Sequence, residues 1–240
     1  MGKAKIYLSP SRQPGNLYAT GNTNEEKEMV KLSKRIKNIL DEEYFCETHL
    51  ATLSLDIGAE GRPKEAKEKN CDIYLAIHSN AGGKGKASGA VALYHPKRPD
   101  SKLLAEYLVM ELNSICPIKS NRSEDLVDGM AAFQGKGYGE IRVPAKLGMT
   151  PVLMETNFHD HPAISEWMTK NTETIARSYV NALVRFMGLQ IRTQAEETVK
   201  EDESEKLYRV QVGAFRKKEN AEILALRLLN EGFEGFIRYS

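Results

Sequence analysis

Short apolar runs that end in polar residues constrain the fold of this chain more than any other feature. The three clearest runs are Lys5–Leu8, Cys71–Ile77 and Pro151–Met154. Their length and their aliphatic content predict buried strands. Ala90–Tyr94 reads as another strand of the same kind.

Amphipathic segments separate these runs. Residues 25–40 place Met29, Leu32 and Ile36 on one helical face, and residues 103–115 and 162–188 repeat the same spacing. Alternating strand and helix patterns predict an α/β fold, with a mixed, largely parallel sheet sandwiched by helices.

Polar side chains cluster at the predicted carboxyl ends of the strands. Gln13 follows the first strand, His78 the second and Glu155 the third. Open α/β sheets bind ligands at this edge, so we expect these groups to share one crevice. An imidazole and a carboxylate are ordinary ligands of catalytic zinc, and a second carboxylate can act as a general base.

Glu25 and Glu26 compete for the role of carboxylate ligand, because both begin the helix that leaves this edge. Thr23 and Glu26 have the spacing of a capping box, which would occupy Glu26 with the helix backbone. That reasoning favours Glu25 as the ligand.

The charge of the chain is nearly balanced, with 34 Lys and Arg residues against 33 Asp and Glu residues. The acids concentrate in residues 195–206, which hold six acids and two lysines and predict a linker. We therefore expect a large domain at 1–189, a linker at 190–206 and a small βαβ module at 207–240.

Composition also excludes several classes of protein. The near-neutral charge argues against a nucleic-acid partner. No apolar run approaches the length needed to span a bilayer, so no membrane partner is expected. Met1–Lys5 leads directly into the first strand, so no secretory signal is expected either.

Two phrases of the sequence resemble the type-3 zinc N-acetylmuramoyl-L-alanine amidases. Residues 73–81 (IYLAIHSNA) are similar to the phrase that carries that family's second histidine ligand, and residues 151–158 (PVLMETNF) to the strand of its catalytic glutamate. The resemblance spans residues 4–188. It implies Zn²⁺ as the cofactor, His78 and Glu25 as metal ligands, and Glu155 as the catalytic residue.

One departure concerns the family's first ligand, a histidine in a turn after the first strand. Here that turn reads SPSRQ at residues 9–13, and Arg12 stands about where the ligand would be. A charged arginine cannot ligate zinc, whereas the carbonyl oxygen of Gln13 can. We expect Gln13 as the third ligand, with Ser11 and His159 as alternatives.

The tail, residues 207–240, resembles a different family from the large domain. Leu207–Phe215 predicts a strand, residues 220–230 a helix and Phe233–Tyr239 a strand, and the phrase VQVGAF at 210–215 resembles half of a SPOR domain, a peptidoglycan-binding module. About 34 residues do not easily build a core of their own. We therefore expect two tails to pair in a homodimer, or the tail to be a truncated remnant.

The resemblance implies hydrolysis of the amide between N-acetylmuramic acid and L-alanine in peptidoglycan, and hence cell-wall lysis. Without a signal peptide, the protein would be made in the cytoplasm and reach the wall after holin- or lysis-dependent release, as an endolysin or autolysin does. Two alternatives remain open: a catalytically inactive peptidoglycan-binding protein, and a zinc peptidase acting on the stem peptide.

Overall fold

The structure is a computed structural model in which most of the first 192 residues can be described. It describes residues 3–82, 84–132 and 134–192, together with residues 212, 213, 215, 218, 220, 221, 224, 225 and 228. The chain divides into two units, Met1–Thr193 and Gln194–Ser240, which are described separately.

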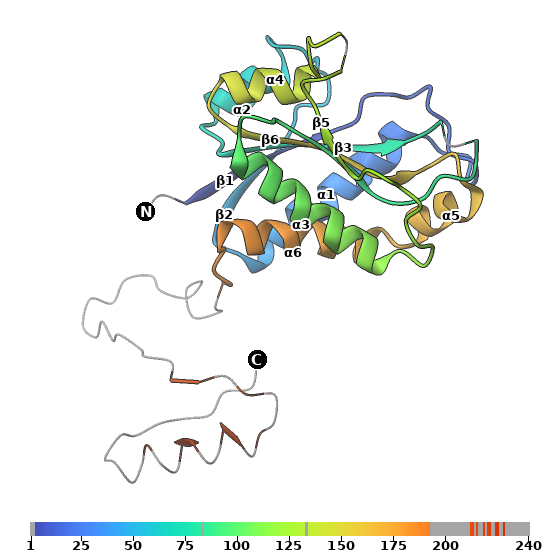
Figure 1. The fold of residues 1–240 in the computed structure, drawn as a ribbon. Helices are drawn as coiled ribbons and strands as arrows, with labels where there is room; N and C mark the ends of the chain where they lie inside the picture. The colour runs from blue at the N-terminus through green and yellow to red at the C-terminus, as the bar shows by residue number, and fades with distance from the viewer. Residues whose placement is uncertain are drawn as a thin grey trace. The chain divides into compact units, whose positions relative to one another are not determined.

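A single mixed sheet organises the first unit (Figure 1). Its strands are β1 (Ala4–Pro10), β2 (Cys46–Leu50), β3 (Ile73–Asn80), β4 (Val91–Tyr94), β5 (Leu126–Asp128) and β6 (Thr150–Phe158), in the order β2-β1-β3-β6-β4-β5. β2, β1, β3 and β6 are parallel, while β4 runs antiparallel to β6 and β5 is parallel to β4. The predicted mixed, largely parallel sheet is confirmed.

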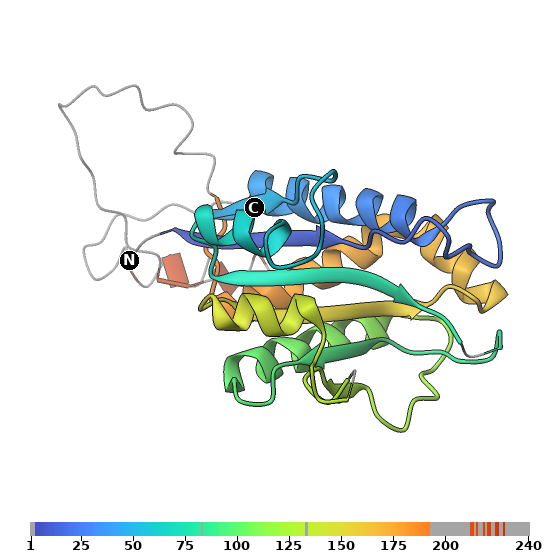
Figure 2. The same cartoon turned by 90° about the horizontal axis from the view of Figure 1, so that it is seen from above.

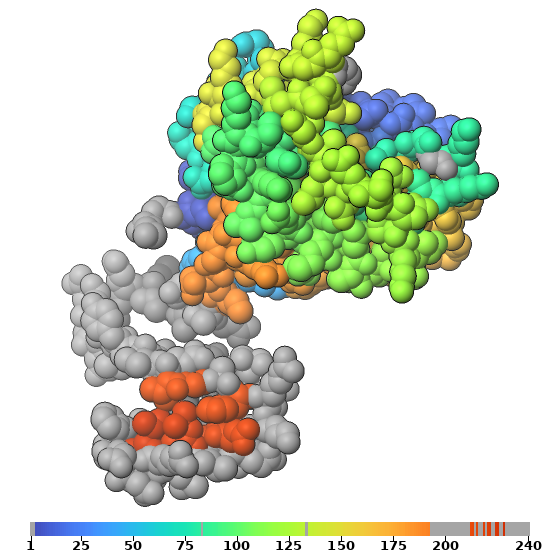
Figure 3. All heavy atoms as spheres, in the orientation of Figure 1, coloured from blue at the N-terminus to red at the C-terminus, as the bar shows by residue number. Residues whose placement is uncertain are grey.

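Helices cover both faces of this sheet. They are α1 (Glu25–Glu43), α2 (Arg62–Glu68), α3 (Pro99–Ile115), α4 (Gly139–Lys146), α5 (Pro162–Lys170) and α6 (Thr172–Met187). α1, α3 and α6 pack on one face, and the shorter α2 and α4 lie over the other (Figures 1 and 2). Seen as spheres, α3 and the segment that follows it cover one side of the unit (Figure 3).

The two faces have separate apolar cores because side chains alternate along each strand. Ile6 and Leu8 of β1 belong to the larger core beneath α1, α3 and α6, whereas Tyr7 between them belongs to the smaller core beneath α2 and α4. Tyr7 stacks on Tyr74 of β3, with ring centroids 5.3 Å apart. A strand buried on both faces explains the continuous apolar runs in the sequence.

Two local predictions are wrong. The helix expected over residues 162–188 is broken at Asn171, whose backbone leaves the helical region (φ −118°, ψ 31°) and whose amide donates to the Trp167 carbonyl. The N-cap of α1 is Asn24, which accepts from the Lys27 amide, while the hydroxyl of Thr23 donates to Glu28. The capping box is therefore absent, although the helix does begin at Glu25.

The strands also extend past the predicted runs. β3 continues through His78 to Asn80, and β6 continues through Glu155 to Phe158. The polar residues expected just beyond the strands therefore lie on them, where the sheet hydrogen bonds fix their backbone. The sequence did not predict β2, α2, β5 or α4.

Little of the second unit is described. Asn220, Ala221, Leu224, Ala225 and Leu228 are helical, within the segment predicted as a helix, and so is Lys218 just before it. The two predicted tail strands and the acidic stretch 195–206 lie wholly or mostly outside the described residues. At the end of the first unit, the backbones of Gln190 and Arg192 pair with those of Phe45 and Glu43. Among the described residues, no helix combines the length and the apolar character that crossing a membrane requires.

Candidate active site

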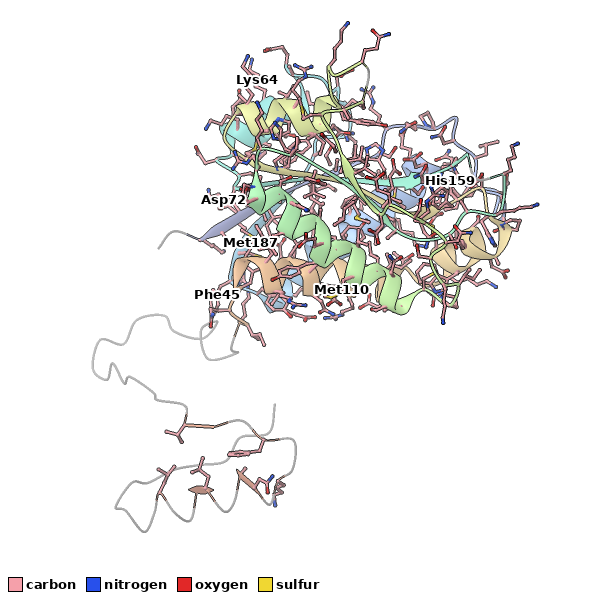
Figure 4. All side chains as sticks on the ribbon, viewed as in Figure 1. Phe45, Lys64, Asp72, Met110, His159 and Met187 are labelled. Carbon is pink, nitrogen blue, oxygen red and sulfur yellow. The ribbon has the colours of Figure 1, made fainter. Side chains whose placement is uncertain are left out.

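The candidate site lies at the carboxyl edge of the parallel strands. His78 on β3 and Glu155 on β6 are direct register partners, and Glu25 is the first residue of α1. Figure 4 shows His159, just beyond β6, at the end of the unit opposite to Asp72, which precedes β3. The structure thus brings together the groups that the sequence predicted at this edge.

Glu25 and His78 are in direct contact. Glu25 Oε1 lies 3.2 Å from His78 Nδ1, and the two residues are 1 % and 5 % exposed. The β3–β6 register shifts between His78 and Asn80, and the Ser79 amide in this irregular stretch donates to Glu25 Oε1. The β-bulge therefore turns a backbone donor toward the carboxylate.

The other oxygen of Glu25 is also occupied. Asn16 Nδ2 donates to Glu25 Oε2 over 2.7 Å. Burial alone would raise the pKa of Glu25, but hydrogen bonds from His78 and Asn16 outweigh it and lower the pKa. Glu25 is therefore a buried carboxylate that stays ionised.

His78 lies between two carboxylates, because its Nε2 is 3.0 Å from Glu140 Oε2. Burial by itself would lower the pKa of His78, but hydrogen bonds to Glu140 and Glu25 raise it to about 10. Without a metal, the ring is an imidazolium whose Nδ1 proton faces Glu25. A histidine binds a metal through a ring nitrogen that carries no proton, so a metal at Nδ1 would displace that proton.

Glu155 differs from Glu25 in its hydrogen bonding and in the direction in which its pKa is shifted. Its Oε2 atom is buried without a hydrogen-bond partner among the described residues. Burial, with the nearby charges of Glu25 and Glu140, outweighs the effect of His78 and raises the pKa of Glu155 to about 7. Two carboxylates whose pKa values are pushed apart are typical of acid–base chemistry, with Glu155 able to take and return a proton near neutral pH.

Glu140 is a site residue that the sequence analysis missed. It is the second residue of the short helix α4, and a positive-φ turn at Gly137 (φ 73°) precedes the helix. A φ of 73° lies in the left-handed region, which side chains with a Cβ atom rarely adopt, so this turn favours glycine. The Gly-Tyr-Gly run at 137–139 was the available signal, but nothing in it indicates a contact with His78, 62 residues earlier.

The loop after β1 holds the residues proposed for the first ligand. Gln13 Nε2 lies 3.4 Å from His78 Nδ1, and Gln13 Oε1 accepts from Asn16. Arg12 is exposed and turns away, toward the Leu55 carbonyl and Asp56. Arg12 therefore does not fill the space beside His78.

The two alternatives to Gln13 differ in their surroundings. The hydroxyl of Ser11 is buried beside Glu25, where it helps to lower the pKa of that carboxylate. His159 is buried too, but its Nδ1 lies 3.0 Å from the Ser79 hydroxyl and its ring stacks on Tyr18. That nitrogen is therefore engaged away from His78.

A divalent metal can be tested against this geometry. Tetrahedral zinc with bonds of about 2.0–2.2 Å separates its ligand atoms by roughly 3.3–3.6 Å. The distance from His78 Nδ1 to Glu25 Oε1, 3.2 Å, is close to that spacing, and the side-chain amide of Gln13 reaches within 3.4 Å of the same nitrogen through its Nε2. Among the described residues, no group of three or more His, Cys, Asp or Glu side chains could hold a metal ion. The residues fit a site with one carboxylate ligand, Glu25, and one imidazole ligand, His78, completed by a neutral oxygen.

Comparison with known proteins gives two matches along the chain. Residues 10–185 match the N-acetylmuramoyl-L-alanine amidase family, and residues 204–240 match the SPOR domain. The N-acetylmuramoyl-L-alanine amidase CwlM of Bacillus licheniformis is 24% identical over 241 residues, covering 98% of this chain and 85% of CwlM. A sporulation-specific N-acetylmuramoyl-L-alanine amidase of Bacillus subtilis is also 24% identical, over 97% of this chain and 84% of its own.

Solved structures share the fold. An N-acetylmuramoyl-L-alanine amidase from Clostridium difficile 630 superposes with a TM-score of 0.64 at 19% identity, covering 78% of this chain and 97% of that one. The N-acetylmuramoyl-L-alanine amidase AmiC2 of Nostoc punctiforme superposes with a TM-score of 0.63 at 16% identity, covering 78% of this chain and 98% of AmiC2.

Proposed function

The chain belongs to the N-acetylmuramoyl-L-alanine amidase family, and on that premise we propose that Glu25, His78 and Gln13 hold a zinc ion and that Glu155 is the catalytic base. The reaction is hydrolysis of the amide bond between N-acetylmuramic acid and L-alanine in peptidoglycan, which lyses the cell wall. The observation that carries the proposal is the meeting of Glu25, His78 and Glu155 at one sheet edge.

Zinc fits the chemistry of the donors. When bound, zinc supplies Lewis-acid chemistry: it lowers the pKa of a water ligand toward about 7 and polarises the scissile carbonyl. Glu25 is kept ionised by its hydrogen bonds, as a ligand must be. His78 offers Nδ1 on the side where Glu25 and Gln13 also lie.

Glu155 is the residue proposed to move the proton. A carboxylate with a pKa of about 7 can accept a proton from the attacking water and return it to the leaving amine of L-alanine. Its unpartnered Oε2 is free for that transfer, because no described side chain or backbone group competes for it.

Gln13 is the proposed third ligand, and its amide must turn over to act as one. Its oxygen now accepts from Asn16, and its nitrogen faces His78. Turning the amide presents the oxygen to the metal and gives up the hydrogen bond from Asn16. The loop position supports this role, because Gln13 is exposed and can turn without repacking the core.

The test is incubation of the purified protein with sacculi, with and without a chelator. New alanine amino termini without new reducing sugars, lost on chelation and restored by zinc, support the proposal. Cleavage that the chelator leaves unchanged refutes the metal mechanism. New amino termini other than alanine indicate a stem peptidase, and binding without cleavage or zinc indicates an inactive wall-binding protein.

The second unit supplies a further part of the proposal. The SPOR match at 204–240 supports peptidoglycan binding by the tail, and hence action at the cell wall. We propose that two tails complete one binding module in a homodimer, and that the protein reaches the wall by holin- or lysis-dependent release. Light scattering of the full chain at increasing concentration tests the dimer, and a monomer at high concentration with an ordered tail contradicts it.

A further inference from the structure

We infer that Glu140 is a positioning residue for His78: it accepts the Nε2 proton and so presents Nδ1 to the metal. This inference rests on the proposed function, because it concerns the ring that would ligate zinc. It adds a buried carboxylate that lies outside the proposed set of zinc ligands and catalytic base.

The contacts of Glu140 fix its role as an acceptor. Its Oε2 lies 3.0 Å from His78 Nε2, and its Oε1 accepts from Ser9 Oγ over 2.7 Å and from Tyr74 Oη over 3.0 Å. Glu140 is only 4 % exposed. Because both oxygens of Glu140 face hydrogen-bond donors, the carboxylate acts as the acceptor toward His78, and the proton of that hydrogen bond belongs to Nε2.

Ser9 is itself held in place from the other side. A guanidinium nitrogen of Arg62, a residue only 1 % exposed, donates to Ser9 Oγ and to the Pro10 carbonyl. Ser9 therefore has a proton donor of its own and can donate its hydroxyl proton to Glu140. This buried network fixes the carboxylate before any ligand binds.

The two ring nitrogens of His78 consequently face different surroundings. Nε2 points into the buried network of Glu140. Nδ1 points toward Glu25 and toward Gln13, which is exposed. Once the ring is neutral, the free lone pair is on Nδ1, which faces Glu25 and Gln13. A carboxylate that fixes the tautomer of a metal-bound histidine in this way strengthens metal binding.

The test compares wild-type protein with Glu140→Gln, Glu140→Ala and a control, Glu65→Gln. Glu65 is also part-buried and hydrogen-bonded, to Tyr7 and Thr52, but makes no contact with His78. Zinc dissociation constants come from competition with a chromophoric chelator, after thermal unfolding has shown which variants fold. We expect Glu140→Gln to raise the constant by about 10–100-fold and Glu140→Ala by more, with Glu65→Gln unchanged.

A second readout follows the ring directly. In the zinc-loaded wild type, ring proton–nitrogen correlation spectra should show His78 protonated at Nε2 and metal-bound at Nδ1. The hydrogen bond to Glu140 should protect the Nε2 proton from exchange with water, and Glu140→Gln should weaken this protection. Equal zinc affinity in wild type and both Glu140 variants, or a ring bound through Nε2, overturns the role of Glu140 while leaving the amidase proposal intact. Wild-type protein that binds no zinc overturns both.

Discussion

Replacing Glu155 by glutamine should remove hydrolysis and at the same time stabilise the metal-free protein above neutral pH. The substitution keeps the size of the side chain and removes its charge. The pKa of Glu155 is raised from 4.5 to about 7, mainly by burial. At about 1.4 kcal/mol per unit, this difference corresponds to roughly 3 kcal/mol that the folded protein loses when Glu155 ionises.

The sign of the pH dependence follows from the two states. Between pH 4.5 and 7 the unfolded chain releases the Glu155 proton, while the folded protein keeps it. Stability therefore falls as pH rises through this interval, and the full loss is present above pH 7. Glu155→Gln should raise the free energy of unfolding by less than about 1 kcal/mol at pH 5 and by up to roughly 3 kcal/mol at pH 8.

Urea unfolding of chelator-treated protein at the two pH values measures this difference. Glu166→Gln is the matched control, because Glu166 is exposed and its carboxylate pairs with Lys170 on the same helix; its effect should stay within about 0.5 kcal/mol at both pH values. In parallel, zinc-loaded Glu155→Gln should keep its zinc and lose about 10²–10⁴-fold in turnover on sacculi. If the gain in the free energy of unfolding of Glu155→Gln does not grow with pH, the argument that ionised Glu155 destabilises the folded protein is refuted. Wild-type turnover in this variant refutes Glu155 as the base.

Three further changes test the site and the tail. Gln13→Ala should weaken zinc binding, and Gln13→His should strengthen it beyond wild type, in the same chelator competition; equal affinities for all three proteins would exclude Gln13 as a ligand. Arg12→Ala should leave zinc affinity unchanged, because Arg12 faces Asp56 rather than His78, and a large change would show that Arg12 shapes the site. A chain ending at Thr193 should keep zinc binding and lose sedimentation with sacculi, whereas undiminished sedimentation would place wall binding in the first unit.

Much of the fold was readable from the sequence because the strands of the parallel core are buried on both faces. Such strands appear as continuous apolar runs, and Ile73–Ile77 is one of them. The short elements were not readable. α4 has eight residues with a proline inside, and its position depends on packing Ile141 into the smaller core rather than on its own propensity.

Part of the site was equally readable. Parallel strands end at one edge, so His78 and Glu155 had to be neighbours once their strands were adjacent. Of Glu25 and Glu26, Glu25 is the buried one and the one that contacts His78, while its role as a ligand stays a prediction. The reason given for preferring Glu25 was wrong, because Asn24 caps the helix.

The sequence by itself determined the α/β class, the strands that carry the chemistry, and the residue types at their carboxyl edge. Those properties depend on local patterns and on chain topology. Only the tertiary structure decided which nitrogen of His78 faces Glu25, that Glu140 occupies the other, and that Arg12 turns away from the site. These are contacts between residues dozens of positions apart, and their geometry depends on how the helices and loops pack around the sheet.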